Sequence, residues 1–168
     1  MKATALLEKQ HRKVEALFKK LSSGKGDLGA VAVELANDLA AHMVIEQEIF
    51  YPKAKAVKKD LVLESYEEHA IARFALERLL ATKPEDESFQ ARVTALKELI
   101  EHHVEEEEED LFPKVNKALA AELEAMGKQM KARFDEVVEE GYASALSTAS
   151  KPAKKVTNGA RVSPGRAR

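Results

Sequence analysis

Apolar side chains recur every three or four residues over five long stretches of the chain, the spacing that gathers side chains on one face of an α-helix. Short polar segments separate these stretches and predict loops. Pro52 is expected to kink or end the second helix because it has no backbone N–H, and Pro113 is expected to lie in the first turn of the fifth. The predicted helices cover about residues 3–22, 28–51, 60–82, 89–112 and 113–140.

The composition favours one helical domain. Of the 168 residues, 45% are hydrophobic, 33% are charged and 5% are aromatic, as is typical of a helical bundle. We therefore predict an all-α fold with a single domain at residues 1–145. The absence of cysteine excludes disulfides, iron–sulfur clusters held by cysteine, and thiol catalysis, so nitrogen and oxygen would be the main ligands of any metal.

A histidine and a glutamate four residues apart occur twice, as His42 and Glu46 and, sixty-one residues later, as His103 and Glu107. Side chains four residues apart lie on the same face of a helix, and both pairs fall on a predicted apolar face. A buried carboxylate is costly unless it is paired or bound to a metal, so packing alone explains the repeat poorly. We interpret the two pairs as half-sites that face one interior.

Two further histidines lie on the apolar faces of the first and third predicted helices. Taken alone, each is explained by a hydrogen-bonded histidine in the core. Together with the repeated pairs, they complete a set of six inward-facing side chains. The candidate metal ligands are His11, His42, Glu46, His69, His103 and Glu107.

Neighbouring residues compete for some of these roles. Glu108 lies five residues after His103, but the repeat favours Glu107. His102 points about 100° away from His103 on a helix, toward the surface. Tyr66, on the third predicted helix, is expected in the core, with a hydrogen-bonding role or a phenolate ligand as alternatives.

The types of side chain in this set limit which metal ions the site can bind. Four imidazoles and two carboxylates suit iron or manganese and leave zinc and copper open. Because a carboxylate can bridge two cations, a dinuclear centre with an open position on each metal is the simplest arrangement. Two redox-active irons could then bind or reduce dioxygen, peroxide or nitric oxide.

The order and spacing of these residues resemble the hemerythrin-like, or HHE cation-binding, family over about residues 3–140. The resemblance implies an up-and-down four-helix bundle built around a non-haem centre of two iron ions, which are favoured over manganese or zinc. The fifth predicted helix would then be an additional C-terminal helix. It also implies that Glu46 and Glu107 are the bridging carboxylates. The similarity rests on the six candidate ligands and on Phe50-Tyr51-Pro52 and Leu111-Phe112-Pro113, which follow the two pairs.

One departure from that family changes the expected function. Oxygen-carrying hemerythrins have a second histidine four residues after the one on the third helix, where this chain has Arg73. The resemblance therefore favours a protein that binds or reacts with dioxygen, peroxide or nitric oxide in sensing or stress defence, including a catalase-like consumption of peroxide. A water or Tyr66 would replace the missing imidazole. The alternatives are iron storage or donation, and a metal-free helical interaction module.

The C-terminal segment differs from the rest in charge. Residues 150–168 contain six lysines and arginines and no acidic residue, and they have too few large apolar side chains to offset their ordering entropy. We predict a disordered basic tail at residues 146–168 that aids solubility, and nucleic-acid binding is not favoured. No apolar run is long enough to span a membrane and no signal peptide is recognised, so a cytoplasmic protein is expected.

Overall fold

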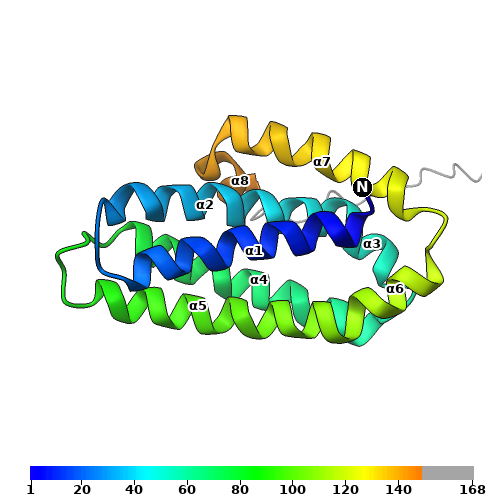
Figure 1. Ribbon diagram of the computed structural model, residues 1–168, viewed down its shortest axis with the longest axis horizontal. Helices are drawn as coiled ribbons and strands as arrows, with labels where there is room; N and C mark the ends of the chain where they lie inside the picture. Colours follow the sequence, from blue (N-terminus) through cyan, green and yellow to red (C-terminus); the bar gives the residue numbers. More distant parts are fainter. Residues whose placement is uncertain (149–168) are drawn as a thin grey trace, which may run out of the picture.

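The structure is a computed structural model that describes residues 1–148. Within this range the protein is all-helical, as predicted, and four long helices lie along its longest dimension (Figure 1). Helices α1 and α4 each pack against both α2 and α5, which confirms the predicted four-helix bundle. Of the predicted disordered tail at residues 146–168, residues 149–168 lie outside the described residues, and residues 146–148 are helical rather than disordered. The bundle helices are α1 (Ala3–Ser22), α2 (Leu28–Ile45), α4 (Lys59–Leu80) and α5 (Phe89–Glu106).

A tight turn brings α2 back along α1. Gly24 and Gly26 adopt φ angles of 67° and 82°, in the left-handed region that glycine enters without strain. Asp27 then caps α2, because its carboxylate accepts a hydrogen bond of 2.9 Å from the backbone N–H of Ala30. The turn sets the register between the two helices, and it thereby brings the first histidine of the candidate site next to the second.

Each histidine–glutamate pair is followed by one turn of π-helix. These turns are η1 (Glu46–Phe50) and η2 (Glu107–Leu111). In each turn, the carbonyl of the glutamate accepts a hydrogen bond from the backbone N–H five residues later, rather than four as in an α-helix. The sequence repeat is therefore also a repeat of backbone geometry.

The π turns correct the helix ends that were predicted at the two prolines. Pro52 does not end the second helix, which continues as α3 (Tyr51–Ala54). Pro113 does not open the fifth helix, because helical structure continues from α5 through η2 into α6 (Phe112–Ala118). Each proline lies in the first turn of the α-helical segment that follows its π turn, where a missing N–H is tolerated. The shifted hydrogen bonds therefore accommodate prolines that would break a regular α-helix.

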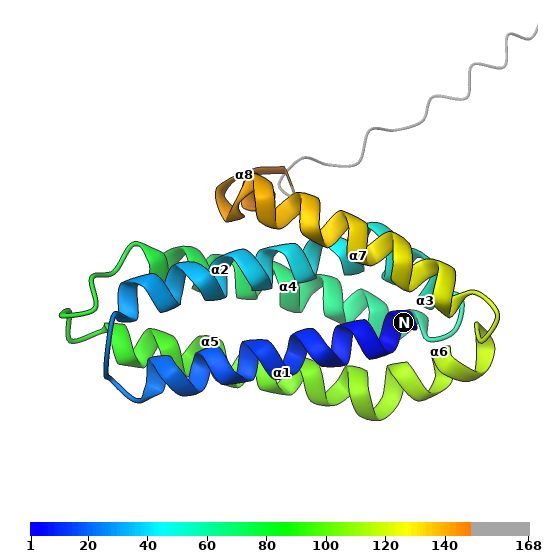
Figure 2. The same cartoon turned by 45° about the horizontal axis from the view of Figure 1, so that its top comes forward.

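The additional C-terminal helix begins later than predicted, because the chain turns after α6 before α7 (Leu123–Glu140) starts. Helix α7 lies across α1 and α2 (Figure 2). A glycine with a φ angle of 83°, Gly141, separates it from α8 (Tyr142–Thr148), which packs on α2. The predicted apolar stripe of α7 is buried at Leu123, Met126, Met130 and Val137.

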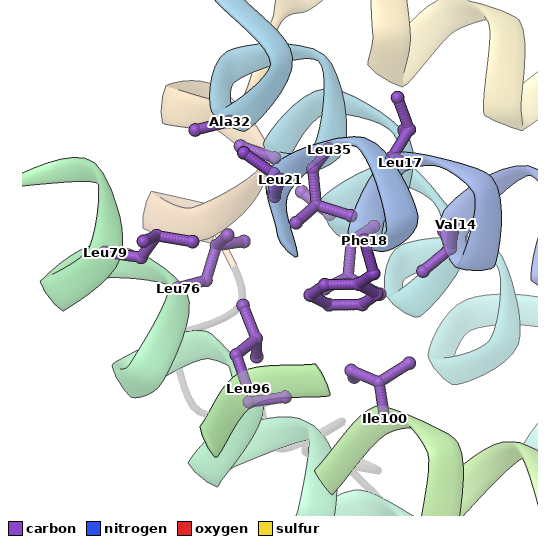
Figure 3. Packing of buried hydrophobic residues seen from close by; sticks show 14 of the residues in the cluster. Val14, Leu17, Phe18, Leu21, Ala32, Leu35, Leu76, Leu79, Leu96 and Ile100 are labelled. Atoms are coloured by element: carbon purple, nitrogen blue, oxygen red, sulfur yellow. The ribbon is translucent and has the colours of Figure 1, made fainter. Parts of the chain in front are cut away.

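Two apolar clusters fill the interior, and the candidate ligands lie where they meet. One cluster includes Phe18, Leu35 and Leu96, which converge between the helices (Figure 3). The other includes Leu7 and Phe50. The helical run Leu28–Ala54 is long and apolar enough to cross a membrane, but 67% of its most apolar window is buried inside the protein. Its composition is accounted for by its place in the core.

Helix α7 approaches the N-terminal backbone so closely that only glycine fits at position 127. A Cβ atom there would collide with backbone atoms of residues 1–3, so we expect Gly127→Ala to lower the free energy of unfolding by about 1–3 kcal/mol. Gly29→Ala is the matched control. A Cβ atom there would lie 3.5 Å from Asp27, an ordinary contact, and the change should be neutral or stabilising by about 0.5 kcal/mol. Urea unfolding measures both, and equal stabilities would contradict the close approach.

Candidate metal centre

The structure brings all six predicted ligands together in the interior. They come from four helices: α1, α2 with η1, α4, and α5 with η2. None is more than 3% exposed. His102, in contrast, has a side chain that is 58% exposed, which agrees with its predicted surface position. Arg73 is half-buried, and within residues 1–148 it forms no ion pair with the carboxylates of the centre.

The donor atoms form two groups that share a carboxylate. One group contains His11, His42, Glu46 and Glu107, and the other contains Glu46, His69 and His103. Within each group, the donor atoms all lie within 4.8 Å of one another. This arrangement is compact enough for one cation in each group.

Each carboxylate lies between imidazoles of different groups. Oε2 of Glu46 is 3.1 Å from Nε2 of His42 and 3.3 Å from Nε2 of His69. Oε2 of Glu107 is 3.4 Å from Nε2 of His11 and 3.7 Å from Nε2 of His103. The positions of the two glutamates are those that bridging ligands of two neighbouring cations would need.

Several buried atoms of the centre lack hydrogen bonds within the described part of the chain. They are both carboxylate oxygens of Glu46, Oε2 of Glu107 and Nε2 of His11. Although some of these atoms lie near imidazole nitrogens, the angles are not those of hydrogen bonds. Buried polar atoms are normally satisfied, and a carboxylate without a partner is costly. Bound cations would satisfy these atoms, so the residues fit a metal centre.

The other ring nitrogen of each histidine is held by a polar side chain from an adjacent helix. Such contacts fix the ring and aim Nε2 at the centre. Each of these four partners is a sequence neighbour of a candidate ligand, but each contacts the histidine of a different helix. The Nδ1 contacts are His11 to Glu108 at 2.7 Å, His42 to Gln10 at 2.9 Å, His69 to Gln47 at 3.1 Å, and His103 to Glu68 at 2.7 Å.

These contacts follow the sequence repeat. Gln10 and Glu68 each precede a single histidine, and each holds a histidine of a repeated pair. Gln47 and Glu108 each follow a glutamate of a pair, and each holds one of the single histidines. The sequence alone suggests Glu108 only as a competing ligand. The structure instead makes it the partner of His11.

Tyr51 is a residue of the centre that sequence analysis missed. Its hydroxyl donates a hydrogen bond of 3.0 Å to Oε1 of Glu107 and lies 3.2 Å from Nε2 of His69 and 3.4 Å from Nε2 of His103. Burial and the two nearby carboxylates raise the pKa of Tyr51 well above its usual value. The hydroxyl therefore keeps its proton in the metal-free protein.

Tyr66, which was considered as a ligand, has a different contact. Its hydroxyl donates a hydrogen bond of 3.4 Å to the backbone carbonyl of Gln47. In the π-helical pattern, the N–H of residue 52 would serve this carbonyl, but residue 52 is a proline. Tyr66 thus compensates for the hydrogen bond that Pro52 cannot make.

Burial and charge shift the pKa values in the centre in opposite directions. Burial, with a contribution from the nearby His103, lowers the pKa of His69 to about 4. Burial also disfavours the charged form of His103, but Glu107 and Glu68 outweigh it and raise its pKa to about 9. The two rings approach to 3.2 Å between their Nε2 atoms, so only one of them readily holds an extra proton.

A groove leads from the surface toward this centre. It lies between α1 and α5, has a volume of about 200 Å³ and reaches His11, with the ion pair of Arg12 and Glu108 along it. A smaller cavity of about 10 Å³ lies beside all four imidazoles. The groove and the cavity share His11 and the side chains Val14, Ile100 and Val104 as lining.

Comparison with known proteins identifies the family. Residues 2–115 match the model of the hemerythrin HHE cation-binding domain. The chain belongs to the hemerythrin HHE cation-binding family. The predicted family is therefore confirmed, and this membership together with the buried histidine–glutamate cluster supports metal binding.

Two relatives of this HHE domain are informative. A crystal structure of a hemerythrin HHE cation-binding domain-containing protein from Mycobacterium kansasii is 26% identical, has a TM-score of 0.76, and is matched over 89% of this chain and 99% of that one. A protein named DNA nickase from Nostoc sp. strain PCC 7120 is 28% identical over 120 residues, which are 70% of this chain and 34% of the nickase. The chain thus spans about a third of the length of that relative.

The two histidines with the largest shifts, His69 and His103, predict the pH dependence of the metal-free HHE domain. Burial disfavours the charged form of His11, but Glu107 outweighs it and raises its pKa, so His11 adds to the loss of stability at alkaline pH. The folded pKa of His69, about 4, is below its ordinary value of 6.5, so its contribution to stability is present above pH 6.5 and is lost as the pH falls toward 4. The folded pKa of His103 is about 9, so its contribution is present below pH 6.5 and is lost as the pH rises toward 9. Chelator-treated protein should be most stable near pH 6.5. Its free energy of unfolding should fall by up to about 3 kcal/mol on the acid side of this maximum (the acid limb) and by up to the same amount on the alkaline side (the alkaline limb).

Urea midpoints across this pH range test the assignment of the two limbs. His69→Gln should flatten the loss of stability at acid pH. Glu68→Gln, which removes one of the carboxylates beside His103, should reduce the loss at alkaline pH, while the contributions of Glu107 and of His11 remain. His102→Ala, at the exposed neighbouring position, should change neither. A stability that rises steadily with pH would contradict the opposite shifts.

Proposed function

We propose that this protein is a non-haem di-iron protein that binds or reacts with dioxygen, peroxide or nitric oxide in sensing or stress defence. The observation that carries the proposal is the pair of overlapping donor groups, in which two carboxylates with unsatisfied oxygens lie between four imidazoles. His11, His42, His69 and His103 would supply the nitrogen ligands, and Glu46 and Glu107 would bridge the two irons.

The donor set fits iron, and its arrangement disfavours a closed structural zinc site. A closed structural zinc site needs four ligands around one ion, whereas here the two groups overlap at a shared carboxylate. Iron accepts both imidazole and carboxylate ligands. When bound, two irons would supply exchangeable coordination positions and redox chemistry. Manganese remains the second choice on ligand type.

The cavity beside the imidazoles limits the ligand to a small molecule. Its volume of about 10 Å³ is close to that needed for one water molecule. Val14, Leu39 and Met43 lie along it, together with the imidazoles, so an organic substrate would not fit without displacing core side chains. This size supports a diatomic molecule or peroxide as the ligand.

The protein's own groups would orient such a ligand and exclude water. The outer contacts of Glu108 and Glu68 hold the rings of His11 and His103 in place. The hydroxyl of Tyr51 is hydrogen-bonded to Glu107 and lies 3.2 Å from Nε2 of His69, so it would adjoin a metal or ligand held by the second group. The apolar side chains along the cavity keep bulk solvent away.

Two other functions have less support. A store of many iron atoms would need a larger space than the compact donor groups provide, and a metal-free interaction module would leave the unsatisfied carboxylates unexplained. The nickase relative does not extend the proposal to nucleic-acid cleavage, because this chain spans only about a third of it.

Metal analysis tests the iron centre directly. Protein purified after anaerobic addition of iron should contain about two irons per chain. His42→Ala and His103→Ala should each lose about one or two irons, and Glu68→Gln should weaken binding about 10–100-fold by releasing His103. His102→Ala is the matched control and should retain the full amount. Equal loss in His102→Ala and His103→Ala, with all variants folded by circular dichroism, would rule out the assigned ligands.

The size limit of the cavity has its own test. Iron-loaded protein should react with hydrogen peroxide at least about tenfold faster than with tert-butyl hydroperoxide. Both reactions are followed through the metal–ligand absorption of the protein. Met43→Ala should reduce this preference because Met43 lines the cavity. Val93→Ala is the control, because it also removes buried volume but lies outside the cavity lining. If both variants alter the preference equally, the cavity does not select the ligand.

A further inference from the structure

The outer face of α4 carries an unusual concentration of exposed apolar side chains. Leu63, Ile71 and Phe74 are 44%, 56% and 61% exposed. They are three of the six large hydrophobic residues that are exposed within residues 1–148, and at 100° per residue they share one side of the helix. Ile71 and Phe74 are three residues apart and therefore neighbours on the helix, and exposed apolar side chains that adjoin one another commonly mark an interaction site. We call this side of the helix, with Glu67 and Arg78, the α4 outer face.

The charged residues of the α4 outer face are arranged by sign. Glu67 lies on the N-terminal side of the apolar pair Ile71 and Phe74, and Arg78 lies on the C-terminal side. Both are exposed, and neither belongs to an ion pair among the ion pairs of residues 1–148. At about 1.5 Å per residue, they are about 16 Å apart along the helix, so they do not pair with each other.

We propose that the protein forms a homodimer in which the α4 outer faces of two copies pack antiparallel about a two-fold axis. An axis midway between residues 72 and 73 sets Ile71 opposite Phe74 of the second copy, and the same register sets Glu67 opposite Arg78 of the second copy. Both contacts occur twice because the interface is isologous. A single register therefore places apolar residues opposite apolar residues and, at the same time, opposite charges against each other.

The surface beside Phe74 has room for a side chain of the second copy. A hollow of about 330 Å³ lies between α4 and α5, and three alanines, Ala75, Ala91 and Ala95, line it together with Phe74 and Arg78. The guanidinium of Arg78 lies 5.7 Å from the centre of the Phe74 ring. An apolar side chain of the second copy could enter this hollow while Glu67 of that copy meets Arg78.

The order of charges favours a second copy over other occupants. A uniformly acidic partner would be repelled by Glu67, and a uniformly basic one, such as the lysine- and arginine-rich segment after residue 150, would be repelled by Arg78. An antiparallel copy of the same face presents the opposite sign at both ends. Complementarity of this kind fixes register and suppresses wrong partners.

Sedimentation velocity of the full chain over a range of concentrations tests the dimer. Wild type should self-associate, and Ile71→Glu should weaken association about tenfold or more by placing a charge against Phe74. Val33→Glu is the matched control, because Val33 is a similarly exposed apolar residue, 42% exposed, on α2. Wild-type protein that stays monomeric at every concentration, or a dimer that survives Ile71→Glu but not Val33→Glu, would overturn the proposal.

A charge exchange tests the register. Glu67→Arg and Arg78→Glu should each weaken the dimer about tenfold, because each places like charges opposite one another. The double variant restores opposite charges across the axis and should recover most of the wild-type affinity. If the double variant is as weak as the single variants, the register is wrong. If removal of residues 149–168 abolishes the dimer while Ile71→Glu does not, the tail rather than α4 makes the contact.

Discussion

The structure depends on how the negative charges of two carboxylates, Glu46 and Glu107, are balanced in an interior that excludes water. An ionised carboxylate in such a place is costly unless opposite charge lies close to it. The imidazoles alone compensate incompletely: the pKa of His103 is raised to about 9, but burial, with a contribution from His103, lowers that of its neighbour His69 to about 4. Divalent cations satisfy the carboxylates without requiring protons on the rings. The close approach of four helices is thereby tied to metal binding.

Single-helix periodicity was sufficient to predict the helices and the inward direction of the six side chains, whereas the four-helix arrangement was predicted from the family resemblance. An apolar face must be buried, so a histidine or glutamate on that face is carried into the interior with it. His42 and Glu46 are an example, because the same four-residue spacing that predicted the helix predicted their common direction. The ends of the helices were predicted less well. The π turns that follow both pairs allow Pro52 and Pro113 to lie inside continuous helical structure.

The residues that sequence analysis missed have two physical explanations. Gln10 and Glu68 hold histidines on neighbouring helices, and the pattern of one helix carries no information about contacts across a helix interface. Tyr51 was missed because five residues correspond to about 140° around a regular α-helix, which would turn it away from Glu46. The π turn inserts one residue and brings residue 51 back above Glu46. The backbone irregularity thus places the hydroxyl in the centre.

The repeat also shows where the two halves of the centre differ. Sixty-one residues separate Tyr51 from Phe112, and both follow a π turn and reach the same depth of the bundle. The ring of Phe112 stacks near His11 at 5.9 Å, whereas the ring of Tyr51 lies beside His69 at 5.4 Å and adds a hydroxyl. The groove from the surface reaches His11, on the side without the hydroxyl. Equivalent ligands therefore have unequal surroundings, because the groove reaches one half and the hydroxyl of Tyr51 lies in the other.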